Sequence, residues 1–235
     1  MIRTVGKIDD HAPIKNVMIA VSDETGLDIL IPGLIKHCPG VTIYASDNNY
    51  SAVARLMPPD KIFQNLLSFW QLARKPEVNG TVIETLQPRV FLGLLGKTYC
   101  RQHQDMIKDI KAIPFDLAII NLRSIISAEA SDNFEIISTR IDVPGQAALA
   151  AAIANPRQVM TLSDHRDYAT LIEELEKLRG HTGLESRLKM AVKGALYLQK
   201  YSSEVADFLS NVSIDEVRSC YEILNPVKDL IKAEN

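Results

Sequence analysis

Short apolar runs rich in β-branched residues recur along the chain, and longer, more polar stretches separate them. The clearest runs cover residues 16–21, 41–45, 115–120 and 158–162. Runs of this length and composition predict buried strands, and strands that alternate with helices predict an α/β domain with a mainly parallel sheet. In such sheets, ligands bind beyond the carboxyl ends of the strands. The polar residues that follow each run are therefore expected to converge on one pocket.

Helical patterns fill the intervals between the strands and the last part of the chain. We expect helices over residues 27–37, 50–57, 102–110, 146–154, 164–179 and 184–209, with one or two more after residue 213. Residues 65–74 also have helical spacing, and Ser22 or Asp23 is expected to cap the helix after the first strand. These patterns predict a polar lead-in over 1–15, an α/β domain over 16–183 and a helical extension over 184–235 that packs on the same domain.

Charge and cysteine usage narrow the classes of partner and site. The net charge is −3, from 26 Lys+Arg and 29 Asp+Glu, which gives no reason to expect nucleic acid or an anionic membrane as a partner. Cys38, Cys100 and Cys220 lie far apart, without the spacing of a zinc site or a disulfide framework. We expect no metal. The N-terminus lacks the apolar core of a signal peptide and the apolar runs are too short to span a bilayer, so we expect a cytoplasmic protein.

Several segments, most of them at the expected strand ends, match one family in the right order. Residues 20–26 (AVSDETG) are similar to its S-V-S-D-K-T-G, and residues 85–96 (TLQPRVFLGLLG) are similar to its K-T-L-H-P followed by G-I-L. Residues 115–122 (FDLAIINL) resemble a strand that ends in N-L-Y-P-F, and residues 141–145 (IDVPG) resemble I-D-I-G-G. Matches at Asn155, Tyr168 and Arg187 follow. Over about residues 16–210 the chain resembles the IMP cyclohydrolase domain of the bifunctional AICAR transformylase/IMP cyclohydrolase family.

The resemblance implies a fold, a reaction and partners. The fold is α/β and methylglyoxal-synthase-like, with a mainly parallel sheet, helices on both faces and a C-terminal helical extension. The family reaction closes the purine ring of a formylated aminoimidazole nucleotide with loss of water, in the cyclic amide hydrolase class, and needs no cofactor. The family forms homodimers. Its larger transformylase domain is expected to be absent from this chain, so a separate transformylase subunit is a candidate partner.

Carried over residue by residue, the resemblance implies a set of site residues. Substrate contacts fall at Ser22, Asp23, Thr25, Gly26, Ser46, Thr85, Asn121 and Gly145, and catalytic roles fall at Asp142, Glu84 and Arg123. The family's lysines are replaced by Glu24, Glu84 and Ala154. A glutamate in place of a lysine near a phosphate changes attraction into repulsion, at a cost of about 1 kcal/mol or more. Arg123, which replaces a tyrosine, restores one positive charge suited to phosphate.

Three hypotheses about function follow. The first is an IMP cyclohydrolase-like protein of purine nucleotide biosynthesis that binds a purine or aminoimidazole ribonucleotide, with weak, altered or lost ring-closing activity. The second is a non-catalytic regulatory or scaffolding relative, in effect a pseudoenzyme. The third is an enzyme for a changed, non-phosphorylated substrate, with Asp142 and Glu84 as an acid–base pair. Plain structural roles also remain open, because Asp142 is well placed to cap the helix that follows it.

Overall fold

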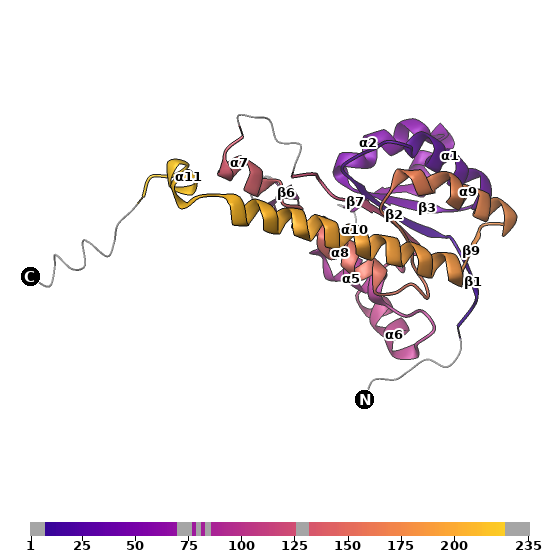
Figure 1. The fold of residues 1–235 in the computed structure, drawn as a ribbon. Helices are drawn as coiled ribbons and strands as arrows, with labels where there is room; N and C mark the ends of the chain where they lie inside the picture. Colours follow the sequence, from indigo (N-terminus) through magenta and orange to yellow (C-terminus); the bar gives the residue numbers. More distant parts are fainter. Residues whose placement is uncertain (1–7, 70–76, 79–80, 83–85, 126–131, 224–235) are drawn as a thin grey trace, which may run out of the picture.

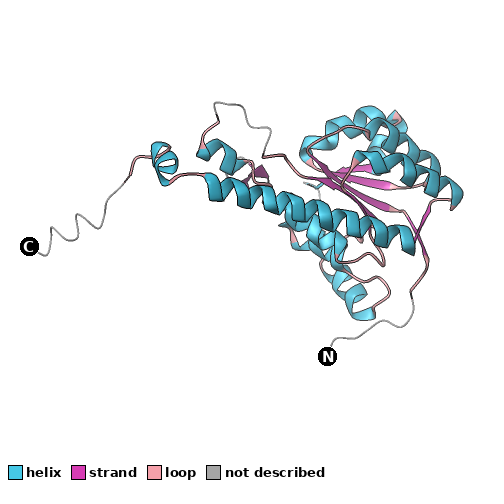
Figure 2. Cartoon of the chain, in the orientation of Figure 1, coloured by secondary structure: helices cyan, strands magenta, loops and turns pink. Residues whose placement is uncertain are grey.

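The computed structural model describes residues 8–69, 77–78, 81–82, 86–125 and 132–223. A parallel sheet lies at its centre (Figure 2). It has five strands in the order β4-β3-β2-β7-β8. The strands are β2 (Asn16–Val21), β3 (Thr42–Ala45), β4 (Leu66–Ser68), β7 (Leu117–Asn121) and β8 (Met160–Leu162). The predicted mainly parallel sheet is confirmed. After β2 the chain moves outward to β3, and after β7 it moves outward to β8 in the opposite direction, so the topological switch point lies between β2 and β7.

Successive residues of the central strands enter two different cores, because strand side chains alternate between the faces of a sheet. Val17 and Ile19 belong to one core, and Met18 belongs to the other. The first core includes helices α1 (Leu27–His37), α2 (Asp47–Leu56) and α9 (Tyr168–Lys177). The second includes α5 (Pro88–Leu95), α8 (Val143–Ile153) and α10 (Leu184–Asn211). Figure 1 shows these two groups on opposite sides of the sheet, which confirms the predicted helices on both faces.

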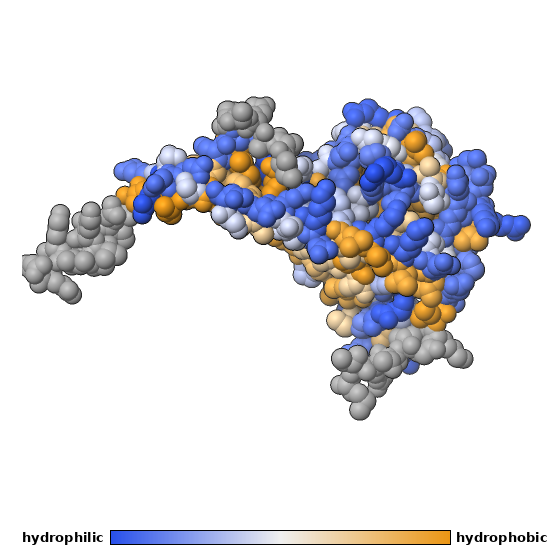
Figure 3. Space-filling model, viewed as in Figure 1, coloured by the Kyte–Doolittle hydropathy of each residue, from blue (hydrophilic) through white to orange (hydrophobic). Residues whose placement is uncertain are grey.

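Helix α10 is the predicted C-terminal helical extension. Its 28 residues give it a length of roughly 42 Å at 1.5 Å per residue. It packs on β8 and α8 and then runs past the sheet toward α7 (Phe134–Thr139) and α11 (Ile214–Ser219) (Figure 1). Gly194 allows the close approach, because a Cβ there would lie 2.9 Å from Ile153 Cγ2. Apolar surface gathers along part of this helix (Figure 3), where Leu188, Val192 and Leu196 are more than half exposed.

The smaller elements lie around this core. They are β1 (His11–Pro13), β5 (Glu77–Val78), β6 (Thr81–Val82), β9 (His181–Gly183), α3 (Pro59–Asn65), α6 (Arg101–Asp109) and the 3₁₀ turn η2 (His165–Asp167). Strand β1 lies within the predicted lead-in and pairs antiparallel with β9, so this segment is tied to the domain by backbone hydrogen bonds.

Some sequence-based expectations about local structure are wrong. Residues 66–68 form strand β4 instead of continuing a helix, because Leu66 and Ser68 pair with Ile43 and Ala45 at the edge of the sheet. Residues 70–74 of that expected helix lie outside the described residues. Helix α2 begins at Asp47 and not at residue 50, because Ser46 Oγ accepts a hydrogen bond from the Asn49 backbone N–H and caps the helix.

Candidate functional site

The carboxyl ends of β2, β7 and β8 open into a cleft of about 1090 Å³ at the switch point. It is lined by Ser22, Asp23, Asn121, Leu122, Arg123, Ser124, Ser163, Asp164, His165, Arg166, Asp167, Lys193, Leu196, Tyr197 and Lys200. Four of the predicted site residues, Ser22, Asp23, Asn121 and Arg123, are among them. The cleft therefore occupies the position where sheets of this topology bind ligands.

Asn121 holds the loop after β2 in place. Its side-chain oxygen accepts hydrogen bonds from the backbone N–H groups of Ser22 (2.6 Å) and Asp23 (2.9 Å). Its side-chain nitrogen donates to the carbonyl oxygen of Asp23 (2.8 Å). The amide of Asn121 is thus used to position the loop, and the loop presents Ser22 and Asp23 to the cleft.

Asn49 fixes the end of β2 from the other side. Its side chain accepts from Val21 N–H and donates to Val21 C=O, both at 2.9 Å. Ser46 Oγ donates to Asn49 Oδ1 (2.7 Å), and Asn49 Nδ2 donates to Glu24 Oε1 (3.2 Å). Ser46, a predicted substrate contact, is buried and already engaged in this network. It is not part of the cleft lining.

The loop between β2 and α1 owes its shape to Asp23 and Gly26. Asp23 Oδ1 accepts from the backbone N–H (2.9 Å) and the hydroxyl (2.6 Å) of Thr25, and these bonds lower the pKa of Asp23, with a smaller contribution from His165. Gly26 has φ +80°, and a Cβ there would lie 3.0 Å from Tyr168 Cδ2. Gly26 is the residue that precedes the first turn of α1. The expectation that Ser22 or Asp23 caps this helix is therefore wrong.

Asp142 has the structural role of a helix cap. Its Oδ1 accepts from Gly145 N–H (2.8 Å) at the start of α8, and its Oδ2 lies 3.5 Å from the backbone nitrogen of Arg123. A Cβ on Gly145 would come within 2.5 Å of Asp142 Oδ2 and 2.7 Å of Leu122 Cδ2, so glycine is required by close contact. Among the residues of the site prediction that the structure describes, Asp142, Gly145, Thr25 and Gly26 are not part of the cleft lining. Glu84 and Thr85 lie outside the described residues.

Helix α10 contributes cleft residues that the sequence-based prediction missed. Lys193, Tyr197 and Lys200 project from one side of this helix at positions i, i+4 and i+7, and all three line the cleft. Tyr197 Oη accepts from Leu122 N–H (2.9 Å), and Lys193 Nζ forms an ion pair with Asp167. The spacing marks a common helix face, but only the docking of α10 against β8 and α8 shows that this face meets the cleft.

The loop after β8 adds an acidic part to the cleft. Asp164 accepts two hydrogen bonds from Arg166 Nε, at 3.0 and 2.9 Å. This pairing lowers the pKa of Asp164 to about 2. His165 contributes to the low pKa of both Asp23 and Asp164, so the exposed imidazole faces two carboxylates.

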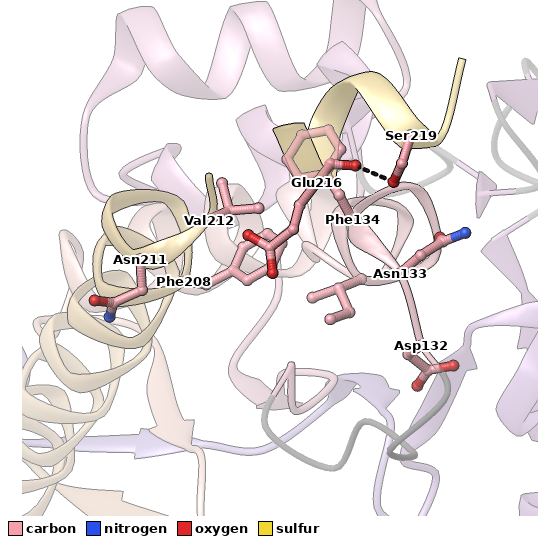
Figure 4. Close-up of a pocket in the computed structure, with 9 residues that line it drawn as sticks. Asp132, Asn133, Phe134, Phe208, Asn211, Val212, Glu216 and Ser219 are labelled. Carbon is pink, nitrogen blue, oxygen red and sulfur yellow. Dashed lines mark hydrogen bonds between the residues drawn. The ribbon is translucent and has the colours of Figure 1, made fainter. Parts of the chain in front are cut away.

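A second hollow, of about 410 Å³, lies between α7, the end of α10 and α11 (Figure 4). The rings of Phe134 and Phe208 stack with centroids 6.0 Å apart. Its polar groups serve the helix ends: Asn133 caps α7, Glu216 completes a capping box with Ser213, and Ser219 donates to the Glu216 carbonyl. Because these groups are engaged in local structure, the cleft at the strand ends is the stronger candidate site.

The described part of the chain also informs on metals, membranes and thiols. No three His, Cys, Asp or Glu side chains within it gather closely enough to hold a metal ion. None of its helices has the length and apolar character needed to cross a membrane. Burial raises the pKa of the Cys38 thiol to about 11, which makes this cysteine a poor nucleophile.

Comparison with known proteins bears on the family resemblance. No protein-family model matches the chain. The bifunctional purine biosynthesis protein PurH of Rhodopirellula baltica is 28% identical over 210 residues, which cover 88% of this chain and 38% of that protein. The PurH proteins of Corynebacterium glutamicum strain R (29% identity, 86% of this chain, 37% of that protein) and Elusimicrobium minutum (26%, 94% and 42%) are also similar. The chain thus spans about two-fifths of the length of these relatives.

One solved structure supports the fold. The crystal structure of ForH matches with a TM-score of 0.68 and 24% sequence identity, over 83% of this chain and 99% of that one. The match agrees with the predicted methylglyoxal-synthase-like fold. Together, the sequence matches over most of the chain confirm the resemblance that the motifs predicted: the chain is similar to the bifunctional purine biosynthesis proteins PurH over most of its own length.

Proposed function

We propose that this chain is an IMP cyclohydrolase-like protein of purine nucleotide biosynthesis that binds a purine or aminoimidazole ribonucleotide in the cleft at the strand ends. The observation that carries the proposal is the cleft itself, at the switch point of a chain similar to PurH over most of its length. At about 1090 Å³ it is slightly larger than most small-ligand pockets. A nucleotide is a suitable occupant for a space of this size with both cationic and acidic walls.

The cleft is held in shape before any ligand arrives. Asn49 fixes the end of β2 through hydrogen bonds to its backbone, and Asn121 fixes the loop that follows β2. Tyr197 fixes the residue that follows β7. Ser22 and Ser163 follow β2 and β8, the two neighbours of β7. Two strand spacings put these serines roughly 10 Å apart. Such preorganisation lowers the entropic cost of binding.

Ring closure is proposed to be weak, altered or lost. The reaction needs a donor for the formyl oxygen and a group that moves a proton. Ala154, at the position of a family lysine, ends α8 without a donor side chain. The Asp142 carboxylate is engaged in capping α8. A homodimer and a separate transformylase subunit are two further predictions, and both follow from the family resemblance.

A thermal-shift series on the purified chain tests the proposal, with IMP, AMP, XMP, AICAR, the corresponding nucleosides and inorganic phosphate. A ligand at one hundred times its Kd stabilises the folded state by about 2.7 kcal/mol, or a Tm rise of roughly 5–11 °C at this chain length. A rise with IMP or AICAR supports the proposal. A rise with nucleosides alone supports an enzyme for a non-phosphorylated substrate, and no rise supports a non-catalytic relative.

A matched pair of asparagine variants ties binding to the cleft. Asn121→Ala removes the hydrogen bonds that shape the loop after β2 and is expected to reduce the nucleotide-dependent rise. Asn65→Ala removes a comparable hydrogen bond, from Nδ2 to the Val41 carbonyl (2.9 Å), at the opposite edge of the sheet. If both variants kept the full rise, the ligand would bind elsewhere and the assignment of the cleft would fail.

A further inference from the structure

The cations of the cleft differ in how their charge is balanced. Arg166 is paired with Asp164 through hydrogen bonds of 2.9 and 3.0 Å, and Lys193 is paired with Asp167. Both pairs lie at the end of the cleft formed by the loop after β8. A bound anion at that end would meet carboxylates as well as cations, so this end is not suited to a phosphate.

The positive charges of Arg123 and Lys200 are compensated far less by nearby carboxylates. Within the described residues no hydrogen bond or ion pair engages the Arg123 guanidinium, and only its backbone N–H has a partner, Asp142. Lys200 Nζ lies 3.7 Å from Glu204 Oε1, with 77% of the lysine side chain exposed. An exposed pair of this kind contributes little and is easily replaced by a stronger one.

The contacts of α10 place Arg123 and Lys200 at the same end of the cleft. Tyr197 Oη accepts from the N–H of Leu122, the residue before Arg123. Tyr201 Oη accepts from the N–H of Asp142 (2.9 Å), and Asp142 also meets the backbone of Arg123. Lys200 lies between these two tyrosines on the helix. Lys193, at the acidic end, is seven residues away, or roughly 10.5 Å along the helix axis.

We propose that this polarity sets the orientation of the ligand: Arg123 and Lys200 bind a phosphate monoester, and Asp23, Asp164 and Asp167 accept hydrogen bonds from hydroxyl or amino groups at its other end. The inference rests on the proposed function, because it assigns the parts of the proposed ribonucleotide to parts of the cleft. A guanidinium binds two phosphate oxygens at once, and an ammonium adds a point charge. Glu24 stands where the family has a lysine, so the positive charge of that lysine is missing after β2. Arg123 after β7 and Lys200 on α10 supply positive charge in its place.

Binding measurements on the full-length chain test this assignment, by calorimetry with AICAR, its nucleoside and inorganic phosphate. The variants are Arg123→Gln, Lys200→Gln and, as a control, Lys189→Gln. Lys189 is an exposed lysine of α10 that does not line the cleft. We expect Arg123→Gln and Lys200→Gln each to weaken AICAR binding by about tenfold or more, because each removes a charge-assisted contact. Nucleoside binding and the Lys189→Gln variant are expected to be unchanged.

The outcomes separate this inference from the proposed function. If the chain binds AICAR but Arg123→Gln and Lys200→Gln bind it as tightly as the unchanged chain, the phosphate lies elsewhere and the inference is wrong. An equal loss of nucleoside and nucleotide binding also overturns it, because the two residues would then not act on the phosphate. If the chain binds inorganic phosphate through Arg123 and Lys200 but no nucleotide, the anion site stands and the proposed function fails. If it binds neither phosphate nor AICAR, both fail.

Discussion

The buried Arg187 side chain connects three separate backbone segments, and its removal offers a strong test of the reasoning about stability. Arg187 is fully buried. Its guanidinium donates to the carbonyl oxygens of Asp9 (3.3 Å), Asp10 (3.2 Å) and Pro156 (3.2 Å), and to that of Thr182. These segments are the N-terminal stretch, the loop before β8, and β9. Burial lowers the pKa of the guanidinium, while the charges of Asp10 and Glu174 act in the opposite direction.

Arg187→Met keeps an unbranched apolar stem and leaves four carbonyl oxygens without their donor. A hydrogen bond to a charged group contributes about 1.5–3 kcal/mol, but burying the guanidinium also costs several kcal/mol. The four carbonyl groups that lose their donor decide the net change in stability, since each unsatisfied buried polar group costs about 1–3 kcal/mol. We therefore expect a loss of about 3–5 kcal/mol in the free energy of unfolding, or a Tm lowered by roughly 6–20 °C at this chain length.

Urea unfolding and calorimetry measure this loss, and Arg166→Met is the control. Arg166 is 81% exposed in a surface pair with Asp164, so its removal is expected to leave the free energy of unfolding nearly unchanged. Hydrogen exchange should also show faster exchange in β1, because Arg187 holds the residues just before it. A change below about 1 kcal/mol for Arg187→Met, with an unchanged urea dependence, would refute the view that these four bonds outweigh the burial of the charge.

Three further predictions follow from single contacts. Burial raises the pKa of Asp116 to about 6, so the free energy of unfolding should fall by about 2 kcal/mol as pH rises from about 4 to 6. Asp116→Asn should remove this fall in urea titrations at several pH values. Gly145→Ala should cost about 1–3 kcal/mol in thermal unfolding, because its Cβ would lie 2.5 Å from Asp142 Oδ2; an unchanged Tm would contradict this. Tyr197→Phe leaves Leu122 N–H without its acceptor, so it should lower stability by about 1 kcal/mol and weaken AICAR binding in calorimetry. Unaltered binding would mean that the loop after β7 does not need this hydrogen bond.

Part of the candidate site was predictable because its residues belong to local motifs at strand ends. Ser22, Asp23, Asn121 and Arg123 follow β2 and β7 in the chain, and parallel strands present their carboxyl ends at one edge. Ser46 and Asp142 carry motif matches too, but the structure uses them as helix caps. A polar residue at a strand end can serve a ligand or the next helix, and only its hydrogen-bond partners distinguish these roles.

The sequence by itself determined the elements that depend on local pattern. The β-branched runs specify β2, β3, β7 and β8, because an apolar run of that length is stable when buried on both faces of a parallel sheet. The motifs in order specify the resemblance to PurH, even at 28% identity. Edge strand β4 escaped prediction, since residues 66–68 become a strand only by pairing with β3.

The tertiary structure alone decided what lies across the cleft. Lys193 and Lys200 are separated from Asn121 by more than seventy residues of sequence, and their helical spacing says only that they share a face. The docking of α10 on β8 and α8 turns that face toward the strand ends. The sequence names Arg187 only as a motif match and does not reveal its structural role, because its full burial and its backbone partners appear only in the structure. Long-range burial and hydrogen bonding depend on how distant elements meet, and no local pattern contains that information.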